Sequence, residues 1–173
     1  ITFYKTTEEL PDFHDYSMEN RTYKYMKSEA LYPFGYGLSY TKFSYSDIRI
    51  SSENINTGES IEVKAKVKNV GFFESDEVAE LYLKDMEANV RVPRWQLTGI
   101  HKVHLKPQEE TDVYFIITPR QMALIDEEGK CILEPGKFQV FVGGSQPDSR
   151  SLYLTRTPVA EAFFNVNGEA LQL

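Results

Sequence analysis

Residues 61–68, Ile61-Glu62-Val63-Lys64-Ala65-Lys66-Val67-Lys68, alternate strictly between apolar and charged side chains. Successive side chains of a β-strand point to opposite faces of its sheet, so this run predicts a strand with one buried and one solvated face. A helix would spread the same apolar residues around its circumference, because its period is 3.6 residues. The stretch therefore predicts a β-sheet that covers a core on one side.

The same period of two recurs along the chain on both sides of this run. Six further strands are predicted from apolar positions within residues 43–50, 79–83, 101–105, 113–117, 138–142 and, as a short last strand, 152–154. The inward parity of the first strand switches near Ser46 and Asp47, as a β-bulge would cause. One weak helical stretch is expected at Pro119–Leu124.

Turn-forming sequences separate the predicted strands. They include Asn56-Thr57-Gly58-Glu59, Pro135-Gly136 and Gly143-Gly144, which favour tight turns or left-handed backbone. Short strands with regular turns and little helix predict an all-β fold, an immunoglobulin-like sandwich of two antiparallel sheets with about seven strands. Because Cys131 is the only cysteine, no intrachain disulfide can link the sheets. The fibronectin type III-like variety of the sandwich is therefore preferred.

The first 38 residues differ in character from the rest of the chain. Of the 23 aromatic residues, 12 lie between Phe3 and Tyr45, yet residues 1–38 show no sustained period of 2 or 3.6. Disordered tails are poor in aromatic residues, so these rings are expected to lie against another surface. We predict an extended, aromatic-rich N-terminal segment at 1–38, a sandwich at 39–155 and a C-terminal tail at 156–173.

Composition argues against several classes of partner. The chain has 19 basic and 26 acidic side chains, a net charge of −7, which disfavours binding to nucleic acid or to an anionic membrane surface. No apolar run is long enough to span a membrane, and the first ten residues carry no signal-peptide pattern.

Few residues offer chemistry. His101 and His104 lie three residues apart on a predicted strand and so on opposite faces, and no metal site is expected. Cys131 is predicted to be a half-buried structural thiol. The acidic residues at 74–77 are expected to solvate a turn. Tyr40 stands where a dinucleotide-binding turn would need its third glycine, and no cofactor is expected.

Residues 31–41, Leu31-Tyr32-Pro33-Phe34-Gly35-Tyr36-Gly37-Leu38-Ser39-Tyr40-Thr41, form a long and unusual string. It resembles the segment that opens the C-terminal fibronectin type III-like domain of glycoside hydrolase family 3, the β-glucosidase and β-xylosidase family. Residues 67–71, 96–103 and 133–138 are similar to later stretches of that family, in the same order. Residues 12–26 look like the end of the family's second domain.

This resemblance implies that the chain is the C-terminal piece of a longer, retaining glycosidase. In that family the catalytic nucleophile lies on an N-terminal barrel and the acid/base usually lies on an α/β domain, so no catalytic residue is carried over to this sequence. The partners implied are those two absent domains, and the glycoside substrate is bound by the parent enzyme only. The family also implies a periplasmic or secreted parent.

The resemblance and the aromatic content together suggest a role for the N-terminal segment. It is expected to pack the sandwich against the absent α/β domain, through Tyr23, Tyr25, Tyr32, Phe34, Gly35, Tyr36, Gly37 and Tyr40. The alternative is a stand-alone carbohydrate-binding or adhesion module, in which Trp95, Tyr82 or Tyr114 presents an exposed ring to a sugar. A self-contained enzyme would need a cleft with two facing carboxyl groups, which the sequence does not identify.

Overall fold

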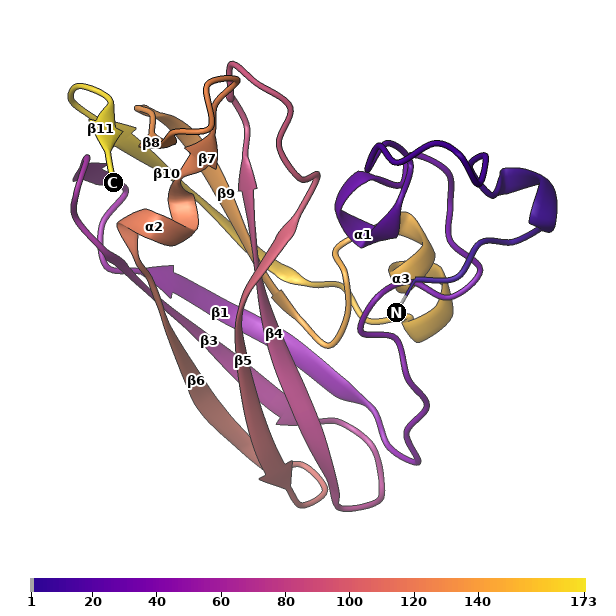
Figure 1. Cartoon of the computed structure of the whole chain (residues 1–173). Helices are drawn as coiled ribbons and strands as arrows, with labels where there is room; N and C mark the ends of the chain where they lie inside the picture. Colours follow the sequence, from indigo (N-terminus) through magenta and orange to yellow (C-terminus); the bar gives the residue numbers. More distant parts are fainter. Residues whose placement is uncertain (1) are drawn as a thin grey trace.

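The computed structural model describes residues 2–173, which contain eleven strands and four short helices (Figure 1). The strands are β1 (Phe43–Ile50), β2 (Asn54–Asn56), β3 (Ile61–Asn69), β4 (Ser75–Asp85), β5 (Gln96–Leu105), β6 (Glu110–Ile117), β7 (Leu124–Ile125), β8 (Cys131–Leu133), β9 (Gly136–Gly143), β10 (Ala160–Asn167) and β11 (Leu171–Gln172). The helices are η1 (Thr7–Glu9), α1 (Thr22–Tyr25), α2 (Pro119–Met122) and α3 (Ser149–Thr155).

Two sheets pack face to face as a sandwich. The first has three antiparallel strands in the order β1-β3-β6, and the second has five strands in the order β2-β10-β9-β4-β5. Only the short β2 runs parallel to its neighbour, β10, among the strands described. A small third sheet, β11-β8-β7, lies at one end of the sandwich (Figure 1). The all-β fold predicted from the period of two is confirmed.

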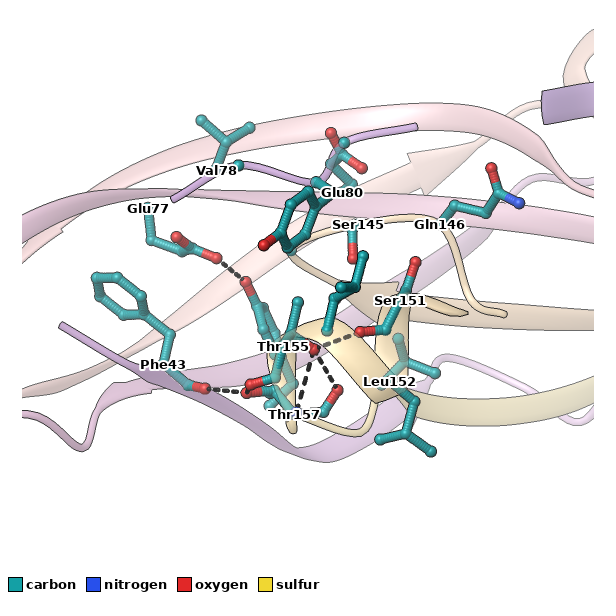
Figure 2. A pocket seen from close by; sticks show the side chains of 18 of the residues that line it. Phe43, Glu77, Val78, Glu80, Ser145, Gln146, Ser151, Leu152, Thr155 and Thr157 are labelled. Carbon is teal, nitrogen blue, oxygen red and sulfur yellow. Dashed lines mark hydrogen bonds between the residues drawn. The ribbon is translucent and has the colours of Figure 1, made fainter. Parts of the chain in front are cut away.

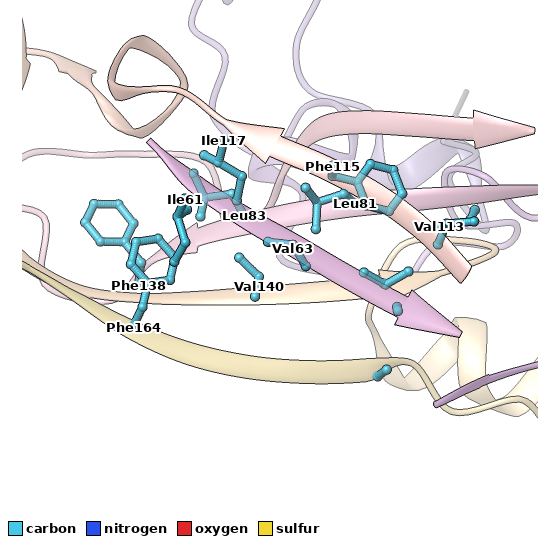
Figure 3. Close-up of a cluster of buried hydrophobic side chains, with 14 of the residues drawn as sticks. Ile61, Val63, Leu81, Leu83, Val113, Phe115, Ile117, Phe138, Val140 and Phe164 are labelled. Atoms are coloured by element: carbon cyan, nitrogen blue, oxygen red, sulfur yellow. The ribbon is translucent and has the colours of Figure 1, made fainter. Parts of the chain in front are cut away.

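The core lies between the two large sheets (Figure 3). The apolar residues within 61–68 face inward from β3. They meet apolar side chains of β4, β6, β9 and β10, among them Leu81, Val113, Phe115, Val140 and Phe164. Fully burying side chains of this kind contributes about 1.5–3 kcal/mol each. On the outer face of β3, Lys64 and Lys66 form ion pairs with Asp112 and Glu110 of β6, both at 2.7 Å. These pairs lie in solvent and contribute little.

Six of the seven predicted strands are confirmed, as β1, β3, β4, β5, β6 and β9. The expected bulge is also present, because the pairing of β1 with β3 shifts between Ser46 and Arg49. Asp47 has a left-handed backbone there, with φ of 50°. The helix expected at Pro119–Leu124 is α2.

The strand predicted at 152–154 is wrong, because these residues form α3. The carboxylate of Asp148 caps that helix by accepting a hydrogen bond from Ser151 N at 2.7 Å. The strand count of about seven is also too low, since the described residues hold eleven strands in three sheets. The seventh long strand is β10, which lies inside the segment expected to be a tail. Its inward residues Phe164 and Val166 belong to the core.

Candidate functional site at the outer face of the five-stranded sheet

The N-terminal segment covers part of the outer face of the five-stranded sheet. Tyr82 points away from the sandwich core, because its neighbours Leu81 and Leu83 point into it, yet Tyr82 is 0% exposed. It belongs to a second apolar cluster with Trp95 and Phe141. Figure 1 shows the N-terminal segment, α1 and α3 gathered on this side of the sandwich. The segment therefore builds a small second core outside the first.

Aromatic contacts attach the segment to the sheet. The ring of Phe34 stacks on that of Tyr23, with centroids 4.5 Å apart and planes at 24°. Tyr23 meets Tyr82 edge-on at 6.2 Å. The Tyr23 hydroxyl accepts a hydrogen bond from Leu97 N at 3.2 Å, and burial raises its pKa. Offset and edge-to-face geometries are the favourable ones for such rings. Phe34 and Tyr23 thus pack on this domain's own sheet.

Backbone hydrogen bonds hold the segment at two places. Arg94 N donates to Lys24 O at 2.8 Å, just after α1 begins. Gln146 N, in the loop between β9 and α3, donates to Phe34 O at 3.0 Å. The Gln146 side chain is buried and donates to Asp148 Oδ2 at 2.7 Å. These bonds give the backbone carbonyls of Lys24 and Phe34 partners where the segment lies on the sheet.

A buried carboxylate lies beneath the segment. The Tyr82 hydroxyl donates to Glu80 Oε2, and burial raises the pKa of Glu80. Gly35 passes directly over this carboxylate with a left-handed φ of 81°. A side chain at position 35 would overlap the Glu80 carboxylate and approach Ser145 Cα to 2.9 Å. Glycine is therefore required at this position by both space and backbone conformation.

An open pocket of about 770 Å³ adjoins the covered face. Figure 2 shows its wall, which is formed by residues 35–45, β4 and the stretch from Gly143 through α3 to Glu161. Glu77 lies at its inner end and accepts a hydrogen bond from the Tyr45 hydroxyl of β1. Burial raises the pKa of Glu77. Glu77 had been expected in a solvated turn, and it is instead a half-buried residue of β4.

The two carboxylates of this wall do not form a facing pair. Glu77 and Glu80 are three residues apart on one strand, so they point to opposite faces of the sheet. Glu77 bonds to Tyr45 between the sheets, and Glu80 bonds to Tyr82 on the outer face. A glycosidase needs two carboxyl groups that flank one bond. This arrangement instead suits two structural carboxylates, each held by a tyrosine hydroxyl.

A sequence profile of the fibronectin type III-like domain matches residues 77–146. This region is a fibronectin type III-like domain. The chain is 41% identical over 131 residues to the β-glucosidase BoGH3A of Bacteroides ovatus, a match that covers 75% of this chain and 18% of that protein. It is 36% identical over 155 residues to the periplasmic β-glucosidase of Salmonella typhimurium, covering 83% of this chain and 20% of that protein.

Solved structures agree with these matches. The β-glucosidase EmGH1 of Erythrobacter marinus superposes with a TM-score of 0.77 at 27% identity, covering 96% of this chain and 21% of that one. The chain spans about a fifth of the length of the curated relatives that it matches. It corresponds to the C-terminal region of these much longer β-glucosidases and β-xylosidases of glycoside hydrolase family 3.

The fibronectin type III-like domain and the N-terminal segment share the site. The matched range begins at Glu77 and ends at Gln146, so it contains the carboxylates, Tyr82 and the residue that holds the segment at Phe34. No pattern in the sequence indicates that residues 34 and 146 meet.

The other predicted interdomain residues divide into two groups. Tyr32 and Tyr36 stack on each other with centroids 5.8 Å apart, and Phe3 meets Tyr32 edge-on at 6.1 Å. Tyr25 lies beneath the Arg91 guanidinium, 5.0 Å from its ring centroid. These contacts are all made within the N-terminal segment or to the hairpin beside it.

Tyr40 and Gly37 contact little of the domain. Tyr40 is 95% exposed, and a side chain at Gly37 would meet nothing within 4 Å. Neighbouring Leu38 is 92% exposed. This end of the segment is consequently free to meet another surface.

The rings proposed for sugar binding are mostly covered. Trp95 is 8% exposed and lies under the Arg94 guanidinium at 4.5 Å, and Tyr82 is fully buried. Tyr114 is 60% exposed, with the Lys64 ammonium 5.3 Å from its centroid. A carbohydrate-binding module would present exposed rings to a sugar. Of these three positions, only Tyr114 presents such a ring.

The two histidines of β5 and the cysteine of β8 lie at separate places in the described part of the chain. His101 is half-buried beside Phe115 while His104 is exposed and bonded to Asp76 at 2.7 Å, so the two imidazoles lie on opposite faces as expected. No group of three potential metal ligands occurs among the described residues. Cys131 is half-buried in β8. None of the described helices is long and apolar enough to cross a bilayer.

Proposed function

We propose that the chain is a non-catalytic accessory domain of a longer family 3 glycoside hydrolase, whose other domains hydrolyse terminal β-glycosidic bonds. One observation carries this proposal: between three quarters and nearly all of the chain is similar to about a fifth of β-glucosidases and β-xylosidases that are more than four times its length. The chain stabilises that enzyme by packing against its catalytic domains, and the substrate is a glycoside bound by the parent.

The chemistry of the site supports a structural role. Glu77 is half-buried and Glu80 is buried, and each accepts a hydrogen bond from a tyrosine on a different face of the sheet. A general acid and a nucleophile would have to converge on one glycosidic oxygen and one anomeric carbon. These side chains instead pack the domain, and catalysis belongs to the parent's other domains.

We further propose which residues face the catalytic domains. Tyr23 and Phe34 pack on this domain's own sheet, so their contribution to an interface is indirect. Leu38 and Tyr40 are almost fully exposed and stand beside the pocket. We place the interface at these two residues, with the N-terminal segment acting as the connection. The periplasmic relative from Salmonella supports a periplasmic or secreted parent.

Expression of the parent polypeptide tests the proposal. The parent should hydrolyse an aryl β-glucoside or an aryl β-xyloside, whereas the purified 173-residue chain should release no aryl alcohol from either. Turnover by the chain alone that persists after removal of host glycosidases would reverse this assignment. Binding of soluble glycans by the chain alone would favour a carbohydrate-binding module instead.

A further inference from the structure

The pocket beside the covered face has an apolar rim. Leu38, Tyr40, Val78 and Leu152 all line it and all expose a large part of their side chains. Exposed apolar groups gathered around one concavity are typical of a surface that contacts another protein segment. The rim belongs to three separate parts of the chain, the N-terminal segment, β4 and α3, so it is a feature of the folded domain.

The wall of the pocket is strongly acidic. Lys42 is the single basic residue of its lining. Five acidic residues line it, namely Asp76, Glu77, Glu80, Asp148 and Glu161. Asp76 is paired with Lys102 at 2.6 Å, and Asp148 caps α3. Glu77 and Glu80 take part in no ion pair within residues 2–173, and their recorded hydrogen bonds come from tyrosine hydroxyls. Buried carboxylates are ordinarily matched by a positive partner.

A separate observation points to a missing polar partner. Ser151 is 4% exposed and lies on the wall of the pocket, on the first turn of α3 (Figure 2). Its hydroxyl has no hydrogen-bond partner among residues 2–173. A buried hydroxyl without a partner is destabilising, and native proteins pair almost all such groups. The hydroxyls of Thr2 and Ser28 also have no partner among the described residues, but only that of Ser151 lines this pocket, where a polar group from another segment would satisfy it.

We propose that this pocket receives a basic side chain, an arginine in preference to a lysine, from a segment of the same polypeptide outside residues 1–173. The inference rests on the proposed function, because the chain matches only about a fifth of its relatives and the other four fifths of such a polypeptide could supply the segment. A guanidinium is weakly hydrated, offers five donors and suits partly buried carboxylates. The apolar rim at Leu38 and Tyr40 would exclude water from the contact.

Thiol protection in the parent polypeptide tests where the segment docks. In a Cys131→Ser background, Leu38→Cys is the probe, and Ile116→Cys on the exposed outer face of β6 is the matched control. The probe should react with a maleimide at least about tenfold more slowly in the parent than in the chain alone, because a covered thiol reacts only when the contact opens. Ile116→Cys should react at the same rate in both.

Charge variants test the chemistry of the occupant. Glu77→Gln and Glu80→Gln are made separately, because the two carboxylates point to opposite faces of the sheet. The substitution at the carboxylate that meets the basic side chain should speed labelling of the parent's Leu38→Cys by about tenfold, since that side chain loses its charged partner. Glu62→Gln, exposed on the outer face of β3, should leave the rate unchanged. A second probe, Leu152→Cys, should respond in the same way. Circular dichroism of each variant confirms that the sandwich is folded.

Three results would overturn the inference. Equal labelling of Leu38→Cys in the parent and in the chain alone means that no segment covers the rim. Protection that persists in both Glu77→Gln and Glu80→Gln means that the occupant is not basic. Protection of the chain alone that grows with its concentration assigns the pocket to a second copy. A parent that hydrolyses aryl glycosides while its Leu38→Cys reacts freely refutes only this inference, whereas an inactive parent refutes the proposed function.

Discussion

The hydroxyl of Tyr82 donates a hydrogen bond of 2.5 Å to the carboxylate of Glu80, two residues earlier on β4. Both side chains point away from the sandwich core, and both are buried by the N-terminal segment. Unpaired burial of a carboxylate is costly, and a hydroxyl donor offsets only part of that cost. The N-terminal segment therefore affects the stability of the folded domain, because its removal would expose Tyr82 and Glu80 to water.

The buried carboxylate predicts a dependence of stability on pH. Burial holds the pKa of Glu80 above its ordinary value of 4.5, so the folded chain binds this proton more tightly than the unfolded chain does. The free energy of unfolding consequently falls as the pH rises from 4.5 through the raised value of the folded state. Glu80→Gln keeps an acceptor for Tyr82 and removes the titration. We expect the variant to gain stability over the wild type as the pH rises from about 5 to 8.

Thermal melting of both proteins across this range measures the effect. Surface carboxylates such as Asp112 act in the opposite direction and at lower pH, because the hydrogen bond from Lys64 lowers the pKa of Asp112 below 3.8. Their contribution is common to both proteins and cancels in the difference. Glu62→Gln on the exposed face of β3 is the control. A difference that stays constant with pH would contradict the burial of an ionisable group at Glu80.

Phe34 tests whether the N-terminal segment packs on its own sheet. Phe34→Ala removes the ring stacked on Tyr23 and should lower the free energy of unfolding of the chain by about 2 kcal/mol, less than a fully buried phenylalanine costs, because Phe34 is half-buried. Tyr40→Ala is the matched aromatic control, since Tyr40 is almost fully exposed and its loss should change stability by less than about 0.5 kcal/mol. Urea denaturation measures both. Equal effects would mean that the segment does not lie on the sheet.

Gly35 and Gly37, which both lie within residues 31–41, should respond differently to replacement by alanine. Gly35→Ala places a side chain against Glu80 in left-handed backbone and should cost about 2 kcal/mol or more from strain and overlap. Gly37→Ala meets open space in ordinary backbone and should be neutral or stabilise by up to about 1 kcal/mol, because alanine restricts the unfolded chain. Denaturant unfolding of the pair decides this. A tolerated Gly35→Ala would place the segment farther from Glu80 than the structure does.

The period of two in the sequence predicted most of the sandwich and little of the site. Alternation in residues 61–68 reports which face of β3 is buried, and it does so without knowledge of the partner sheet. The strand expected at 152–154 failed because two leucines two residues apart fit a strand, while Asp148 three residues before Ser151 is a helix N-cap signal. The N-cap at Asp148 explains why residues 152–154 belong to a helix and not to a strand.

The contact between residues 34 and 146 could not be predicted in this way. It joins positions 112 apart in the chain, and its shorter hydrogen bond, from Gln146 N to Phe34 O, is made by backbone groups that every residue carries. Tyr82 likewise has the parity of a solvent-facing residue, and only the covering segment makes it part of a core. Local pattern reports the faces of a strand, whereas the burial of an outer face depends on which distant segment lies on it.

β10 lies within residues 156–173, which the sequence pattern predicts to be a tail, and the neighbouring rings of Phe163 and Phe164 should contribute unequally to its stability. Phe164 is fully buried and stacks on Phe138 of β9 with centroids 5.4 Å apart, so Phe164→Ala should cost about 3–5 kcal/mol and markedly lower the melting temperature. Phe163 points outward, beneath the Lys137 ammonium at 4.9 Å, and Phe163→Ala should cost less than about 1 kcal/mol. Calorimetry of the two variants compares neighbouring rings of one strand. Similar losses at both positions would contradict the inward parity of β10, and a wild-type melting curve for Phe164→Ala would remove this strand from the core.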